Sequence, residues 1–127
     1  MLRGVLANES GTISIEAALA LPLFLAVTLG AVDLSVYNNV KTAMQNAASE
    51  AIRALSIDAV TAAEAQTMIA NRMSVWTGSA TSSVSTSGDD ITVTVNVPTS
   101  DIPVAGIIHI FDGKASLVAS ATAVKLD

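Results

Sequence analysis

The sequence predicts an α+β fold: a single N-terminal transmembrane helix that extends into a long amphipathic helix, then a second helix and a small antiparallel sheet of about three strands. Three observations predict it: an uncharged block at residues 17–32, an apolar period of three to four residues behind that block, and apolar–polar alternation nearer the C-terminus. The 127 residues suffice for an anchor and one small domain. We therefore expect a leader at 1–11, a transmembrane segment at 12–33 and an α+β domain at 34–127.

The composition excludes several classes of function. The net charge is −5, and six scattered Lys and Arg residues do not form the basic patch that nucleic-acid binders carry. The chain has no cysteine, which excludes a disulfide framework, thiol catalysis and cysteine-ligated metal. Hydrophobic residues make up 51% of the chain but aromatic residues only 3%, so any core outside the apolar block is built from Ala, Val and Ile.

The apolar block is slightly short for a membrane span. Residues 17–32 lie between two acids, Glu16 and Asp33, whereas a bilayer core asks for roughly 20 apolar residues. Ile13 and Ile15 lengthen the stretch only if Glu16 is tolerated near its edge. A charged side chain inside a membrane costs about 3 kcal/mol, so this carboxylate needs to be neutralised or paired.

A removable secretory signal peptide is the alternative for this block. Small residues around Thr28 and Gly30 offer a cleavage site that would leave Ala31 as the mature N-terminus. Against this alternative, the preceding region carries one cation and two acids, which is a poor n-region. The few charges that flank the block do not set its orientation.

A long helix is predicted from about residue 12 to 56. Pro22 removes one backbone hydrogen bond within it and is expected to kink it. Beyond Asp33 the apolar residues recur every three or four positions, which is one face of an amphipathic helix. That face holds Val36, Val40, Met44, Ala47, Ala51 and Leu55, and the opposite face holds Asn38, Lys41, Gln45, Ser49 and Arg53.

A second helix is predicted at 61–76. Thr61 and Glu64 have the spacing of a capping box, in which each side chain accepts a hydrogen bond from a free N–H group of the first turn. An apolar stripe at helical spacing follows, and we interpret its Met and Trp residues as core packing against the first helix. The stripe comprises Ala65, Met68, Ile69, Met73 and Trp76.

The C-terminal part of the chain predicts the sheet. A turn at residues 88–90 separates the Ser/Thr-rich segment 80–87 from 91–97, where Ile and Val alternate with Thr and Asn, so these segments are expected to form a hairpin. Residues 115–126 are predicted as a third strand, and 104–111 form an apolar segment of undetermined type. The apolar face of this sheet has to pack on the helices at 36–56 and 61–76.

No residue pattern indicates an enzyme. His109 is the only histidine and has no carboxylate or serine near it in sequence, so we expect it to be structural or exposed. Asp89 and Asp90 lack the ligand spacing of a calcium loop and are interpreted as turn residues. Nucleophile elbows, phosphate loops and metalloprotease motifs are absent from the sequence. We therefore expect no catalytic residues, no cofactor and no metal.

Two hypotheses account for Glu16. In the first it is an interfacial acid at a helix N-terminus, where the macrodipole favours an anion by up to ~1 kcal/mol. In the second the chain is cut after Gly11, which leaves the amine of Thr12 as a cation four residues before Glu16. Glu16 of one subunit then pairs with the amine of another, offset by roughly 6 Å along the helix. Such a pair neutralises both charges and fixes the register of helices packed side by side.

The segment Gly11-Thr-Ile-Ser-Ile-Glu16 resembles the processing site of type IV prepilins, with the acid at the fifth mature position. More narrowly, the chain resembles TadE-like pseudopilins of the tight-adherence (Flp) pilus system. The resemblance spans most of residues 11–125 and departs at Ala17, where relatives usually carry Phe or Tyr. It rests on AALALP behind Glu16, LGAVDL (29–34), MQNAASEAIRAL (44–55), ITVTVNVP (91–98) and ASLVASATAVK (115–125).

The resemblance implies a minor pilin or pseudopilin that supports biogenesis of a Flp-type pilus. It implies cleavage between Gly11 and Thr12 by a prepilin peptidase, and single-pass anchoring in the bacterial inner membrane with an exocytoplasmic C-terminal domain. The implied partners are other pilin or pseudopilin subunits, the pilus assembly platform and membrane lipid, without nucleic acid. The alternative is a secreted or signal-anchored binding module with no pilus role. A location in the fibre, at its tip or in the platform stays open.

Overall fold

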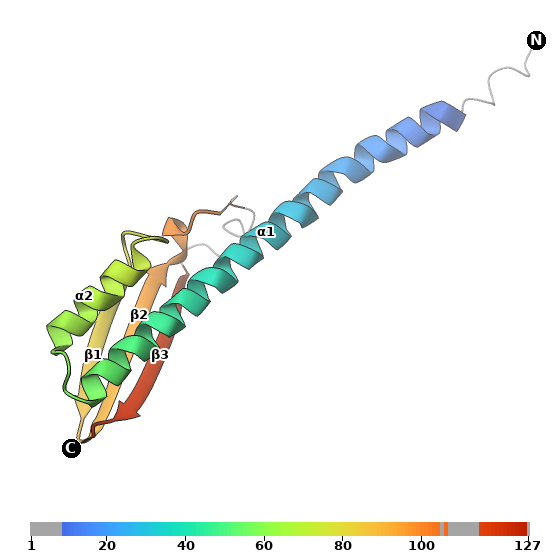
Figure 1. The fold of residues 1–127 in the computed structure, drawn as a ribbon. Helices are drawn as coiled ribbons and strands as arrows, with labels where there is room; N and C mark the ends of the chain where they lie inside the picture. The colour runs from blue at the N-terminus through green and yellow to red at the C-terminus, as the bar shows by residue number, and fades with distance from the viewer. Residues whose placement is uncertain (1–8, 105, 107–114, 127) are drawn as a thin grey trace, which may run out of the picture.

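The computed structural model describes residues 9–104, 106 and 115–126, and shows one long helix that packs by its C-terminal half on a small sheet (Figure 1). The predicted α+β fold is confirmed. We call the C-terminal half of the long helix, the second helix and the sheet together the C-terminal domain. The elements in chain order are α1 (Glu9–Ser56), α2 (Ala62–Met73), β1 (Thr81–Ser87), β2 (Asp90–Pro98), the 3₁₀ helix η1 (Thr99–Asp101) and β3 (Ser116–Val124).

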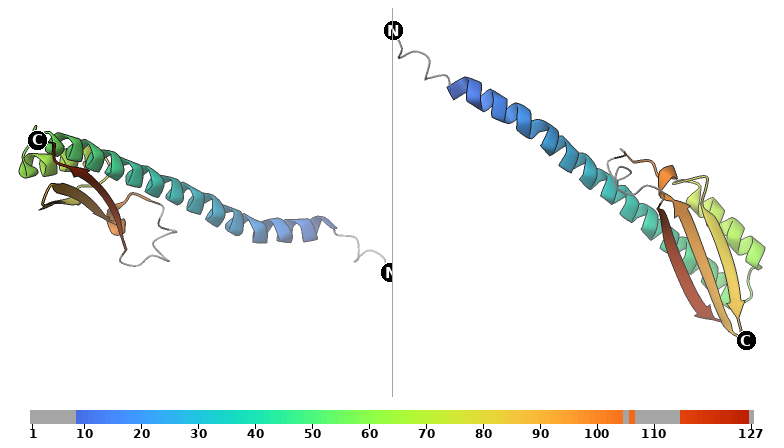
Figure 2. Two further views of the ribbon diagram at one scale, coloured as in Figure 1. Left: turned by 90° about the horizontal axis from the view of Figure 1, so that it is seen from below. Right: turned by 180° about the vertical axis from the view of Figure 1, so that it is seen from behind.

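Helix α1 confirms the prediction of one continuous helix and begins three residues earlier than expected, at Glu9 instead of residue 12. Gly11 costs about 1 kcal/mol in a helix interior, which is too little to end a helix backed by a long apolar run. The helix also continues through Pro22 without a break. Its 48 residues correspond to roughly 72 Å, and its N-terminal half extends away from the C-terminal domain (Figure 2).

The amphipathic half of α1 packs as predicted. Val40, Met44 and Ala51 are fully buried, and Val36 at the start of this face is half-buried. On the opposite face Asn38, Lys41, Gln45 and Arg53 are exposed, and Ser49 is half-buried. This half of α1 therefore forms the spine of the C-terminal domain.

Helix α2 is shorter than predicted because it ends at Met73 instead of residue 76. The N–H groups of Trp76 and Thr77 both donate to the carbonyl oxygen of Met73, at 2.9 and 3.0 Å, which closes a turn. Val, Trp, Thr and Gly follow one another here, and all are weaker helix formers than Ala or Leu. Of the predicted core residues, Met73 is fully buried and Trp76 packs half-buried against the core, but Met68 is only half-buried.

The capping box of α2 is confirmed, and it supports a first prediction. The Glu64 N–H donates to the Thr61 hydroxyl at 3.3 Å, and the Thr61 N–H donates to the Glu64 carboxylate at 2.7 Å. Removing the cap with Thr61→Ala is expected to lower the free energy of unfolding by about 1 kcal/mol. Urea titration followed by circular dichroism measures it. Thr67→Ala, an exposed change inside the same helix, is the control.

The same cap gives this prediction a pH dependence. The backbone N–H of Thr61, and then its hydroxyl, hold the pKa of the Glu64 carboxyl below its usual 4.5. A lowered folded-state pKa stabilises the fold above the unfolded-state value, and the contribution is lost as the pH falls through the folded-state value. The difference between the wild type and Glu64→Gln should therefore shrink below about pH 4.5. A difference that is constant with pH would contradict this origin.

The sheet is antiparallel and three-stranded with a hairpin of β1 and β2, as predicted, and β3 pairs with the other edge of β2, which gives the strand order β1-β2-β3. Ser87 pairs with Asp90, so Gly88 and Asp89 form a two-residue turn. Gly88 has φ +63°, which suits the first turn position of a type II′ hairpin, the position that favours glycine. In β2 every second residue is buried, from Ile91 to Val97, and the Thr and Asn residues between them are half-buried on the other face.

Both helices cover the same face of the sheet, with α1 over β2 and β3 and α2 beside β1 (Figure 1). The C-terminal tail holds the far end of the domain together. The N–H of Leu126 donates to the carbonyl oxygen of Ser56 at 2.8 Å, and the N–H of Lys125 donates to that of Asp89 at 2.7 Å. The Lys125 ammonium also lies 3.0 Å from the carboxylate of Asp58. The end of α1 is thereby fixed to the hairpin turn.

Candidate functional site: the N-terminal half of α1

The N-terminal half of α1 is an exposed apolar rod. Within residues 13–56 of α1, the most apolar 18-residue window has a mean hydropathy of 2.1, and none of that window is buried in the chain. Its exposed large side chains include Ile13, Leu19, Leu23, Phe24, Val27, Val32 and Leu34. This helix is long and apolar enough to cross a membrane. In water so large an apolar surface would need a cover, which lipid or neighbouring helices supply.

The two predicted site residues lie on the first turns of this rod. Gly11 is half-buried and Glu16 is exposed, and Glu16 forms no ion pair within the described residues. The bond between Gly11 and Thr12 lies inside the helix. Helix ends open at low cost, so this bond becomes accessible after local fraying of the first turn. The single chain does not test the pairing of Glu16 with a second amine, which stays a prediction.

The burial of Asp33 was not predicted from the sequence. It was treated as the end of the apolar block, but its side chain is 0% exposed and Tyr37, one turn later, is 8% exposed. Together with Val40 and Met44 these residues have the spacing of one helix face. That spacing was visible in the sequence and would have extended the buried face of α1 back to Asp33.

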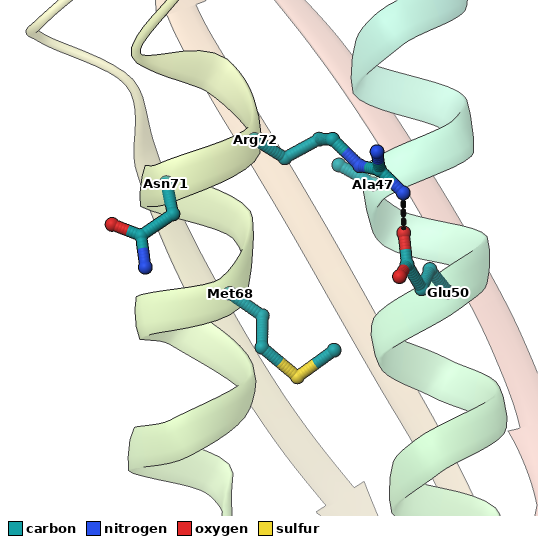
Figure 3. Close-up of a pocket in the computed structure, with 5 residues that line it drawn as sticks. All are labelled: Ala47, Glu50, Met68, Asn71 and Arg72. Atoms are coloured by element: carbon teal, nitrogen blue, oxygen red, sulfur yellow. Dashed lines mark hydrogen bonds and ion pairs between the residues drawn. The ribbon is translucent and has the colours of Figure 1, made fainter.

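A shallow groove separates α1 from α2 on the side away from the sheet. A hollow of about 350 Å³ in it is lined by Ala47, Glu50, Met68, Asn71 and Arg72. Arg72 and Glu50 form an ion pair across the groove (Figure 3). Both side chains are exposed, and such pairs contribute at most about 1 kcal/mol. The groove holds no nucleophile–base arrangement, so it offers packing surface instead of chemistry.

The remaining candidates lie elsewhere. Asp89 and Asp90 are exposed at the hairpin turn, which confirms their interpretation as turn residues. Residues 9–104, 106 and 115–126 bring no three His, Asp or Glu side chains together in a way that could hold a metal ion. His109, and most of the apolar segment 104–111, lie outside the residues that the structure describes.

A comparison with known protein families finds a match within α1. Residues 11–53 match the family described as TadE-like protein. Over this segment the chain is similar to TadE-like proteins. The match begins at Gly11 and ends near the C-terminus of α1, so it covers 43 of the 127 residues and almost the whole long helix. The family recognised from the sequence is confirmed over these residues, and the resemblance of β2 and β3 to the family stays a prediction.

The matched segment contains the helix that is long and apolar enough to cross a membrane, which fits a membrane-anchored protein. No curated protein and no solved structure matches the chain.

Proposed function

We propose that the chain is a minor pilin or pseudopilin of a tight-adherence pilus, which is cleaved after Gly11 and packs through the N-terminal half of α1 with other pilin subunits. One observation carries the proposal. The TadE-like segment coincides with α1, and the half of α1 behind Glu16 is apolar and uncovered. A helix of this kind has a use only in lipid or among similar helices.

The C-terminal domain then works as a rigid body attached to the packing helix. Because α1 is continuous from Glu9 to Ser56, the position of the helix among its neighbours sets the position of the sheet. The domain lies on the exocytoplasmic side of the inner membrane, and the peptidase cuts on the cytoplasmic side. The expectation that the chain catalyses no reaction and binds no cofactor stays a prediction.

The mature N-terminus tests this proposal. The full chain is expressed with a prepilin peptidase, extracted from membranes and sequenced from its N-terminus. Thr12 as the first residue supports the pseudopilin. Ala31 as the first residue contradicts it in favour of a secreted module, and Met1 contradicts the cleavage in favour of a plain signal anchor.

Gly11→Asp gives the second prediction. The variant is expected to lose peptidase cleavage entirely, because a bulky charged side chain replaces the hydrogen of glycine beside the cleaved bond. Electrophoretic mobility measures it, since the uncleaved chain keeps eleven more residues. Gly78→Asp is the control, because this exposed glycine has open space around its Cα and lies far from the site. Equal mobility of Gly11→Asp and a cleaved wild type would contradict the proposed cleavage site.

A further inference from the structure

The turn of α1 at residues 32–34 has one buried side and one exposed apolar side. Asp33 is 0% exposed, whereas its neighbours Val32 and Leu34 are 53% and 56% exposed. One side of this turn is therefore covered by the chain itself, and the other side still presents the apolar surface of the rod. The C-terminal domain and the apolar surface overlap along the helix axis.

The length of the apolar rod determines how far along α1 a membrane span extends. Residues 17–32 between the two acids correspond to about 24 Å of helix, and a bilayer core is about 30 Å thick. A solvated carboxylate at position 33 would end the span there, because carrying it into lipid is costly. Since the side chain of Asp33 is covered, lipid chains at this level meet only Val32 and Leu34. The lipid-facing surface thus continues to Leu34, over about 27 Å.

The residues after Leu34 match the next layer of a bilayer. The headgroup region adds about 5–8 Å on each side, which is about three to five helical residues. The exposed residues in that stretch of α1 are polar and uncharged: Ser35, Asn38 and Asn39. Lys41, two residues further on, is exposed, and its ammonium suits the phosphate groups at the outer rim.

The domain reaches the same level from its other side. Figures 1 and 2 show η1 at the end of the C-terminal domain that faces the N-terminal half of α1. Here Ile102 is 3% exposed and fixed in the core, and the residues around it are exposed: Ser100, Asp101 and Pro103. The Asp101 carboxylate accepts a hydrogen bond from the Ser79 hydroxyl. The covered face of α1 starts at Asp33, below the level of the headgroups, so no bare stretch of helix separates the bilayer from the domain.

We infer that the C-terminal domain is seated directly on the bilayer, with residues 35–41 of α1 and the turn at residues 99–103 in contact with phosphate-bearing lipid headgroups. This rests on the proposed function, because it requires residues 17–34 to span the membrane. It goes beyond an anchor with a free domain: the lipid surface limits the tilt of the sheet before the subunit leaves the membrane.

Site-directed spin labels test the seating. The chain has no cysteine, so single-cysteine variants of the full chain label cleanly. Three exposed positions report on three levels: Leu25 in the middle of the span, Pro103 at the near end of the domain and Ser87 at its far end. Ser100 is a second reporter for the near end. The labelled proteins are reconstituted in phosphatidylcholine vesicles, and their accessibility to oxygen and to a water-soluble nickel chelate is measured.

The accessibility to the nickel chelate is expected to rise from the span to the far end of the domain. Leu25 is accessible to oxygen and loses all contact with nickel, Ser87 has full contact with nickel, and Pro103 and Ser100 show a partial loss of nickel contact. If Leu25 is buried in lipid but Pro103 and Ser100 match Ser87, the domain stands clear of the bilayer; the seating is overturned and the anchor is retained. If Leu25 itself has full contact with nickel, the span fails, and the proposed membrane anchoring fails with it.

Discussion

Replacing Glu16 by glutamine is expected to leave the chain folded and cleaved after Gly11 but to weaken its association with neighbouring pilin subunits by roughly 100-fold. An isolated carboxylate in lipid costs about 3 kcal/mol, and its pairing with the Thr12 amine of a neighbour removes that cost. The amide of glutamine has no such cost to remove and no charge to pair. The difference of about 3 kcal/mol corresponds to roughly two powers of ten in the association constant.

Co-purification from membranes with a tagged second pilin subunit measures the effect. Glu50→Gln is the matched control, because Glu50 is an exposed acid on the same helix whose ion pair is with Arg72 of its own chain. The control is expected to associate normally. Under the alternative, in which Glu16 only interacts with the helix macrodipole, Glu16→Gln would change the association little. Normal recovery of the partner with the glutamine variant would therefore remove the pairing hypothesis.

The sequence was informative where structure follows from local periodicity. The three-to-four-residue period behind Asp33 predicted the buried face of α1, and strict alternation predicted β2 and its facing. The capping residues Thr61 and Glu64 located the start of α2 to within one residue, since the helix was predicted from 61 and begins at Ala62. In each case the side chains that decide the element lie within a few residues of one another, so packing with distant parts of the chain adds support but does not alter the result.

The features that were predicted wrongly or missed depend on contacts between parts of the chain that are distant in sequence. The end of α2 was placed three residues late because apolar spacing alone continued to Trp76, although the turn that ends the helix keeps Trp76 against the core. The burial of Asp33 was missed because a charged residue predicts exposure unless tertiary packing covers it. The groove between α1 and α2 depends on how two helices pack, which neither helix determines alone. Glu16 is recognised by its motif, but its pairing is a relation between two chains.

Val95→Asp is expected to unfold the C-terminal domain without removing the anchor. Val95 is fully buried in the central strand, between Ser82 of β1 and Ala119 of β3. An uncompensated buried charge costs about 3–5 kcal/mol, and the lost valine packing adds to it. Small domains have stabilities near the lower end of about 5–15 kcal/mol, so this one change removes most of the total. Loss of cooperative thermal unfolding in the circular dichroism signal measures it.

Thr94→Asp is the matched control, since it places the same charge one residue earlier on the outer face of β2, where it is expected to cost less than about 1 kcal/mol. The pair also separates the two halves of the molecule. The proposed cleavage site and membrane span both lie before Val36, so Val95→Asp is expected to be cleaved and inserted like the wild type. If the unfolded variant still associates through Glu16, helix packing alone holds subunits together. If only Thr94→Asp associates, the domain contributes contacts of its own, and the seating on the bilayer positions them.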